Sequence, residues 1–472
     1  MQNSRLIELF SALEKTEQRE LGKFARSPVY NQRQDVVDLY DYLYQNAPFT
    51  KAGTIERAAV FTAIFPGETF DSAKMDYTMS FLFQVTKAWL IYKEQAADSV
   101  ANQVLLARAL RRRNLERLFD KEIKTAEKSL ESQPYRNSDF HYQAYRLHFE
   151  KQAAASRQNR NSTTSFQEFS SELTTFFIAQ KLWQACSTVI YQTVFQADIQ
   201  QAMLAEVLAH VERGGYENVP AINLYYHCYK ALTEENSQPW FAALRDLLQQ
   251  HYQAFPVDEL KDLHLLAINY CIKRFNTGET AFLKEAFQLY QEGLSIGVFL
   301  ENNSLSRYTY NNIVMAGLLL KEFDWVENFL HEYRDSIEAK YRESTFNYNL
   351  AIYYFQKPDY EKAMDLLQRA DFDDVMHNLN ARRMLLKIYF EKDEREALNS
   401  LITSFKNFIY RHRELGAYHR ALYMNLLKFT KRLLNIRPND KEAFYTLKVT
   451  VEAAEPVAEK AWLLKVLEGL SG

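Results

Sequence analysis

Apolar side chains recur every three or four positions along most of this chain, which is the spacing of one face of an α-helix. Near the N-terminus, Thr16 and Glu20 have an offset close to that of a capping box, and they predict a helix that ends near Ser27–Pro28. A second helix is predicted to end before Pro48, from the spacing of Val37, Tyr40, Leu43 and Tyr44.

A long helix that begins at Asp71 or Ser72 is predicted to be the buried centre of this first region. Aspartate and serine are favourable N-caps. One face of the helix carries the apolar stripe Met75, Met79, Leu82, Val85 and Trp89. We therefore expect residues 1–97 to form a compact N-terminal helical module.

The remainder of the chain also shows helical spacing. Residues 98–165 predict a connector of two long helices broken at Gln133–Pro134, followed by a polar loop over 156–165. From 166 to 472, helices of 12 to 20 residues alternate with short turns, and we predict no strand. The predicted fold class is all-α, in three parts: 1–97, 98–165 and 166–472.

The segment Tyr348–Ala363 carries a specific pattern of apolar, turn and small residues. It resembles a tetratricopeptide unit, in which Tyr354 would face the second helix and Ala363 would be the small residue at the helix crossing. The sequence departs from the family pattern at Asn347, where the family has a large aromatic residue, and at Pro358, where it has glycine. The resemblance implies a right-handed α-solenoid of helical hairpins.

Weaker copies of this pattern flank the best unit. The positions comparable to Ala363 are Ala243, Ala286, Val326 and Ala397. The successive intervals are 43, 40, 37 and 34 residues. We therefore expect a divergent tetratricopeptide-like array over about 220–410.

The resemblance also implies a candidate peptide groove on the first helix of the best unit. Asn349 stands where the family often has an asparagine that contacts the backbone of a bound peptide. The candidate groove residues are Thr345, Tyr348, Asn349, Ile352 and Phe355.

The composition argues against several other kinds of protein. With 12 Gly and 10 Pro in 472 residues, all-β folds and glycine-rich nucleotide loops are disfavoured, and no Gly-x-Gly occurs. The 10 His and 3 Cys form neither a His-Glu-x-x-His nor a Cys-x-x-Cys motif. We expect no catalytic residues, no cofactor and no metal site, and we expect the cysteines to be buried.

The overall charge is nearly balanced, with 57 basic and 60 acidic residues. The longest clean apolar stretch, 313–320, is far shorter than the roughly 20 residues of a membrane span. The N-terminus lacks the apolar core of a secretory signal. We expect a cytoplasmic protein without general affinity for membranes, for which nucleic acid is an improbable partner.

Basic residues are concentrated in residues 406–448, where ten Lys and Arg face three acidic residues. This region is a candidate docking surface for an acidic protein segment or nucleic acid, a contact for end-to-end association, or a passive surface. The candidate docking residues are Arg411, Arg413, Arg420, Lys428, Lys431 and Arg432.

Three classes of function follow. The leading hypothesis is a non-enzymatic scaffold or adaptor that binds a peptide or partner helix in the concave groove of the array. The alternative is a transcriptional regulator, because residues 55–90 are similar to a winged-helix DNA-binding head, although the helix from Asp71 to Leu90 has no Arg. An enzyme with an unfamiliar site is the third class.

Overall fold

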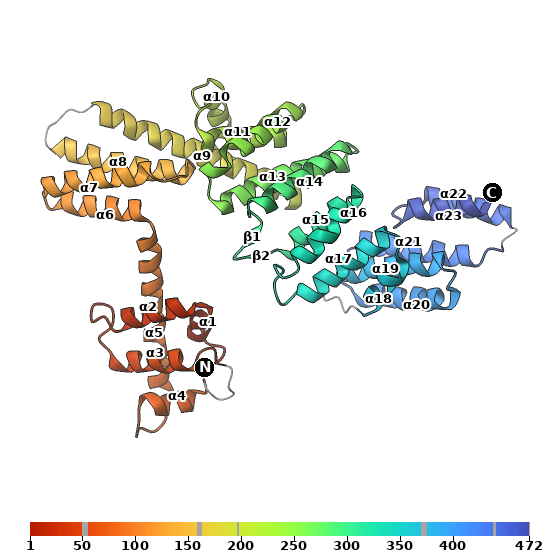
Figure 1. Cartoon of the computed structure of the whole chain (residues 1–472), viewed down its shortest axis with the longest axis horizontal. Coiled ribbons are helices and arrows are strands. Elements are labelled where there is room, and N and C mark those ends of the chain that lie inside the picture. The colour runs from red at the N-terminus through yellow and green to blue at the C-terminus, as the bar shows by residue number, and fades with distance from the viewer. Residues whose placement is uncertain (50–54, 158–162, 196–197, 370–374, 438–439, 472) are drawn as a thin grey trace. The chain divides into compact units, whose positions relative to one another are not determined.

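The computed structural model describes residues 1–49, 55–157, 163–195, 198–369, 375–437 and 440–471. These residues are almost entirely helical (Figure 1), so the all-α prediction is confirmed. The chain divides into two compact units. Unit 1 is Met1–Ala185 with Gln200–Tyr225, and unit 2 is Cys186–Ile199 with Tyr226–Gly472. Both predicted boundaries, at 97/98 and at 165/166, fall inside unit 1.

The helices that begin in unit 1 are α1 (Arg5–Ala12), α2 (Lys15–Ala25), α3 (Gln34–Asn46), α4 (Arg57–Ile64), α5 (Ser72–Ala97), α6 (Ser99–Arg112), α7 (Glu116–Glu131), α8 (Ser138–Arg157), α9 (Thr163–Phe195), α10 (Leu204–Glu212) and α11 (Pro220–Thr233). Helices α9 and α11 continue into unit 2.

The helix α5 is central to the N-terminal module, as its apolar stripe predicts. The side chains of Met75, Leu82 and Trp89 are buried in one core with side chains from α1 to α4. The Asp71 carboxylate accepts hydrogen bonds from two amides in the first turn of α5, which confirms the predicted cap. The predicted Thr16 cap is wrong, because the capping box that starts α2 pairs Glu14 with Glu17.

Residues 98–157 form three helices where two were expected. The additional break lies at Asn114, whose φ of 58° is the left-handed conformation that asparagine tolerates better than most residues. Helices α6, α7 and α8 share a core that includes Val104, Phe119, Ile123 and Leu147. Of the predicted polar loop over 156–165, residues 158–162 lie outside the described residues, and α9 already begins at Thr163.

The elements that begin in unit 2 are α12 (Gln238–His251), the 3-10 helix η1 (Tyr252–Ala254), α13 (Val257–Asn276), α14 (Ala281–Ser295), β1 (Leu300–Glu301), β2 (Ser304–Leu305), α15 (Arg307–Leu319), α16 (Phe323–Glu332), α17 (Arg342–Gln356), α18 (Tyr360–Arg369), α19 (Val375–Glu391), α20 (Arg395–Arg411), α21 (Ala417–Leu434), α22 (Lys441–Ala453) and α23 (Lys460–Ser471).

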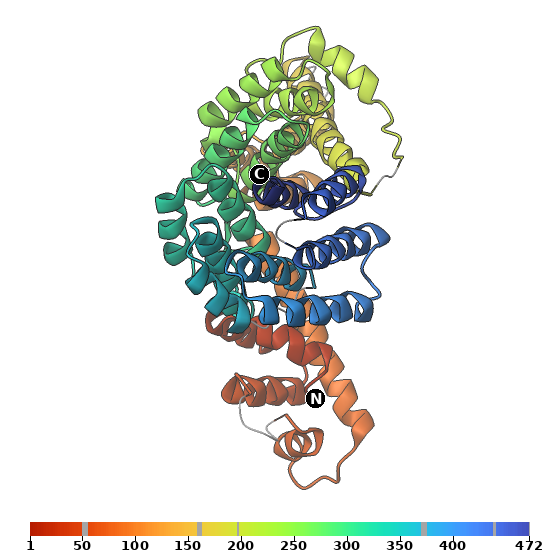
Figure 2. The same ribbon diagram turned by 90° about the vertical axis from the view of Figure 1, so that its right-hand side faces the viewer.

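Successive helices of unit 2 pack as hairpins. Contacts join α13 to α14, α15 to α16, α17 to α18, α19 to α20 and α22 to α23. Figure 2 shows the hairpins from α13 to α20 following one another along a curve. Of the five predicted crossing residues, Ala286, Val326 and Ala363 are fully buried, whereas the other two are half-buried.

A short antiparallel pair of strands departs from the all-helical prediction. β1 and β2 are joined by Asn302 and Asn303, which have φ values of 50° and 60°. Two consecutive asparagines with positive φ are typical of a two-residue hairpin turn. This was a local signal that the helical spacing obscured.

The cysteines Cys186, Cys228 and Cys271 are free and buried, as predicted. Among the described residues, no helix has both the length and the apolar composition that crossing a bilayer requires.

Candidate functional site

The predicted peptide-groove residues lie on α17, where they face the protein interior. Thr345, Tyr348, Asn349 and Ile352 are buried, and Phe355 is half-buried. These side chains are buried because α17 packs against α15, α16, α18 and α19, so little of its surface reaches solvent. These residues offer no open groove to a peptide, and the expectation placed on them is corrected accordingly.

Their polar groups form a chain of hydrogen bonds across four helices, which we call the polar ladder. The Asn349 amide donates to Asn311 Oδ1 on α15 at 2.6 Å. On the next helix, the Asn380 amide donates to the Tyr348 hydroxyl at 3.2 Å, and the Tyr423 hydroxyl of α21 donates to Asn380 Oδ1 at 3.2 Å. The polar ladder therefore marks one common side of α15, α17, α19 and α21.

Near this ladder, a segment of the chain itself lies against α19 and α21. We call Ala454–Glu459, which connects α22 to α23, the closing segment. Its Glu459 carboxylate forms ion pairs with Arg383 and, at 2.8 Å, with Lys387 of α19. The Ala458 amide donates to the Leu422 carbonyl at 3.1 Å, and the Asn425 side chain donates to the Pro456 carbonyl at 2.9 Å. The closing segment is thus bound by both side-chain and backbone contacts.

The two cations that hold Glu459 stand in a partly buried position. Burial lowers the pKa of Arg383, and burial together with the Arg383 guanidinium lowers the pKa of Lys387 to about 8. The Glu391 carboxylate acts in the opposite direction on the pKa of Lys387, because it stabilises the charged ammonium. The site therefore favours a bound anion.

The open counterpart of this surface is on α15. Tyr308, Asn312, Met315 and Leu319 are all exposed, and their spacing of four, three and four places them on one helix face, which we call the α15 face. The Tyr308 side chain is 63% exposed and the Leu319 side chain is 51% exposed, whereas large apolar side chains are more often buried.

The sequence contained the signal for the α15 face. The interval of 37 residues between the crossing residues Val326 and Ala363 carries Thr345, Asn349 and Ile352 back onto Tyr308, Asn312 and Met315. The same shift carries Phe355 onto Leu318, which is buried. The shift therefore places three of the five predicted groove positions on exposed residues of the preceding hairpin.

The predicted basic docking residues are accessible but are not grouped in one patch. Arg411, Arg413, Lys428, Lys431 and Arg432 are exposed, and Arg420 is half-buried. Within the described part of the chain, none of the six forms an ion pair. Because α21 rises about 1.5 Å per residue, the cations before it and those near its end lie roughly 20 Å apart. Lys431 and Arg432 also occupy the last turn, where the helix dipole favours cations.

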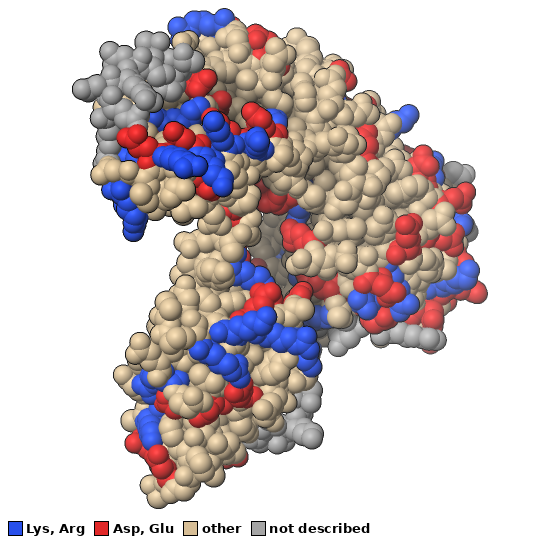
Figure 3. Space-filling model, turned by 60° about the vertical axis from the view of Figure 1, so that its left-hand side comes forward, with Lys and Arg blue, Asp and Glu red and all other residues tan. Residues whose placement is uncertain are grey.

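Charges on the N-terminal module and on α7 are largely interleaved with opposite charges (Figure 3). On α5, the Lys74 ammonium is 2.6 Å from Glu68, and Lys93 is 2.8 Å from Glu17. This interleaving is typical of a solvated surface.

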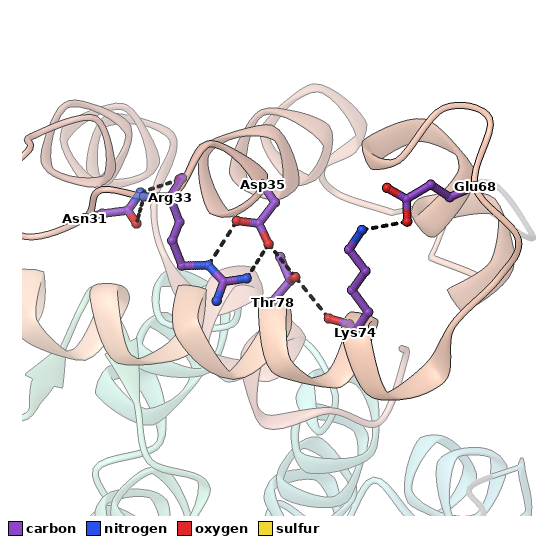
Figure 4. A network of polar contacts seen from close by, with 6 residues as sticks. All are labelled: Asn31, Arg33, Asp35, Glu68, Lys74 and Thr78. Carbon is purple, nitrogen blue, oxygen red and sulfur yellow. Dashed lines mark hydrogen bonds and ion pairs between the residues drawn. The ribbon is translucent and has the colours of Figure 1, made fainter.

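Figure 4 shows a further ion pair of this module in detail. Arg33 donates to Asp35 at 3.0 and 2.5 Å, and the Thr78 hydroxyl of α5 donates to the same carboxylate at 2.8 Å. Burial raises the pKa of Asp35, but the hydrogen bonds from Arg33 and Thr78 outweigh burial and hold that pKa below its usual range. These groups join α3 to α5, so they have a structural role. The winged-helix alternative gains no support from this surface.

No constellation in the described residues suggests catalysis. Groups of three or more His, Cys, Asp or Glu that could hold a metal do not occur there. A cavity of about 380 Å³ between α19 and the C-terminal helices is lined mainly by apolar side chains such as Leu433 and Phe444. Its charged groups are already engaged, since Arg395 pairs with Asp393 and the Trp462 indole donates to Glu391.

Comparison of the chain with protein-family models, with curated proteins and with solved structures found no match.

Proposed function

We propose that this protein is a non-enzymatic interaction scaffold, a right-handed α-solenoid of tetratricopeptide-like hairpins that holds an extended segment of a partner protein on the α15 face. The observation that carries the proposal is the closing segment, because it is a non-helical stretch of chain lying on the side marked by the polar ladder.

The repeat intervals relate the α19 surface that holds Glu459 to the exposed α15 face. The 34-residue interval between Ala363 and Ala397 carries Asn349 onto Arg383, and the 37-residue interval carries it back onto Asn312. One repeat position is therefore open in α15, buried in α17 and occupied by the chain's own Glu459 in α19. We therefore propose that this position, which holds the closing segment on α19, can hold a partner segment on α15.

The chemistry of the α15 face suits an extended peptide. Tyr308, Met315 and Leu319 can each bury apolar area against a partner side chain, and full burial of such a side chain stabilises by about 1.5–3 kcal/mol. The Asn312 amide forms a hydrogen bond with Tyr290, and its remaining N–H and its carbonyl oxygen match the two hydrogen-bonding groups of a peptide backbone. Tyrosine anchors are also common among the residues that dominate binding energy.

The experiment is a selection of peptides from a displayed random library against the purified full-length chain. We expect the double variant Tyr308→Ala/Met315→Ala to bind the selected peptides at least tenfold more weakly than the unmodified chain. The matched control is Tyr445→Ala on α22, which removes a similarly exposed tyrosine remote in sequence from α15. Equal binding by the double variant, or equal loss in the control, would contradict the proposal.

A further inference from the structure

We propose that Arg383 and Lys387 form a second binding site, specific for a carboxylate-bearing extended segment of a partner protein, and that the closing segment is its built-in competitor. This inference deepens the proposed function and rests on its claim that the hairpin array holds extended segments. It adds the chemistry of the ligand and an intramolecular control of access.

The site is built on one face of α19. Arg383 and Lys387 are four residues apart, so their side chains lie next to each other on the helix surface. Their side chains are 29% and 18% exposed, and the Glu459 side chain between them is 15% exposed. A charge-assisted hydrogen bond in such a partly buried position is stronger than one on the open surface.

The present occupant leaves the positive charge incompletely balanced. Glu459 pairs with two cations, and Glu391, one turn further along α19, is the other carboxylate that acts on Lys387. A third cation, Arg382, precedes them on α19 and stacks over Phe408 at 4.8 Å, so three cations face two carboxylates. Within the described residues, the buried Nε atoms of Arg382 and Arg383 have no hydrogen-bond partner. A ligand with a second acidic group near the first would complement this site better than Glu459 alone.

The closing segment has features of a replaceable occupant. Glu459 has a φ of 54°, a left-handed conformation that non-glycine side chains disfavour. Glu455 of the same segment is largely exposed and does not contribute to the site. Of its bonds to α21, two involve the backbone, through Pro456 and Ala458. A free peptide without the left-handed residue can present the same carboxylate without this strain.

A carboxylate-bearing protein segment is favoured over a nucleic acid because the group already bound is a carboxylate and because backbone contacts accompany it. The neighbouring hydrogen bonds from Asn425 and to Leu422 are made with peptide groups, which a nucleic acid lacks. The six cations of the predicted docking surface, five of them exposed, do not form ion pairs with Glu459.

The test uses the full-length chain and a fluorescent peptide with the sequence of residues 452–461, Glu-Ala-Ala-Glu-Pro-Val-Ala-Glu-Lys-Ala. We expect weak binding to the unmodified chain. The Glu459→Gln variant weakens the internal competitor, so the peptide should bind at least tenfold more tightly. Adding Arg383→Gln and Lys387→Gln to that variant should abolish the gain. The matched control, Glu455→Gln, should leave affinity unchanged.

A second variant keeps the inference testable if the Glu459→Gln variant does not fold. Lys460→Ala removes the bonds from the Lys460 ammonium to the Glu452 and Ala454 carbonyls, which hold the closing segment to the end of α22, and it leaves the α19 and α21 contacts of the site in place. We expect it to tighten peptide binding severalfold while circular dichroism stays unchanged. The inference is overturned if neither variant tightens binding, if the gain survives loss of both cations, or if a single-stranded oligonucleotide binds the same site more tightly than the peptide.

The α15 variants separate this inference from the proposed function. Tyr308→Ala/Met315→Ala should leave binding of the acidic peptide unchanged, because those side chains belong to a different hairpin. Failure of the α19 test with success of the α15 test would reject only the carboxylate site. The converse result would reject the α15 face and retain the carboxylate site.

Discussion

Glu150 is a charged residue buried completely in unit 1. Its carboxylate accepts hydrogen bonds from Arg108 and Arg111 of α6, each at 2.7 Å. Removing one partner of a buried ion pair leaves an uncompensated charge, which is more damaging than replacing the whole pair.

We expect Glu150→Gln to lower the free energy of unfolding of unit 1 by about 3 kcal/mol, measured by urea denaturation. Glu116→Gln, on the exposed first turn of α7, should change it by less than about 0.5 kcal/mol. Equal effects of the two substitutions would show that the Glu150 ion pairs do not stabilise the fold.

His264 makes the stability of unit 2 depend on pH. It is buried on α13, its Nδ1 lies 2.8 Å from the Leu260 carbonyl, and burial lowers its pKa below the ordinary value of 6.5. A base whose pKa is lowered by folding binds protons more readily when unfolded, so stability falls as the pH drops below about 6.5. Glu292 raises this pKa and Arg245 lowers it, both less than burial does.

We therefore expect the melting temperature of the unmodified chain to fall between pH 7.5 and pH 5, and to fall less in His264→Gln. Calorimetry at several pH values measures this difference. His148 in unit 1, whose pKa is also lowered by burial, contributes in the same direction and remains in both proteins. Parallel pH curves would assign the loss of stability to other groups.

At the level of elements, the hairpin α15–α16 depends on a close approach at Gly317. A Cβ placed there would lie 2.5 Å from Val326 Cγ2 and 3.1 Å from Phe287 Cε2. Val326 is the residue that the repeat pattern places at the crossing, and it is fully buried.

We expect Gly317→Ala to destabilise unit 2 by about 1–3 kcal/mol through overpacking, seen as a lower melting temperature. Gly469→Ala on α23 is the control, because nothing lies within 4 Å of its added Cβ and alanine favours helix. If both variants melt alike, the crossing is looser than described.

The sequence predicted those features of the helices that depend on residues close together in the chain. The stripe on α5, the Asp71 cap and the burial of Ala363 follow from spacing and residue type, and all are found. The break at Asn114 and the Asn302–Asn303 turn were missed because helical spacing continued around them.

The site was harder to predict because its accessibility is decided by non-local packing. Nothing within α17 indicates that α19 covers it, or that Glu459 reaches back about 70 residues to Arg383 and Lys387. The repeat intervals relate positions in neighbouring hairpins but could not tell in which hairpin a position is exposed.

At the scale of the whole molecule, the hairpins of unit 2 have an exposed face on α15 and a site on α19 that the chain's own Glu459 occupies. Several cations of the N-terminal module, such as Lys74 and Lys93, form ion pairs, and the basic residues around α21 are separated into two groups. Binding of a partner segment is therefore expected on the side marked by the polar ladder.

The most direct measurement of this claim is site-specific photo-crosslinking with a peptide selected from the library. A photoreactive amino acid is introduced at Asn312 on the α15 face or, as a control, at Tyr445 on α22, and crosslinked products are mapped by mass spectrometry. We predict a crosslink from position 312 that an excess of unlabelled peptide removes, and none from position 445. A crosslink from 445 with none from 312 would contradict the account.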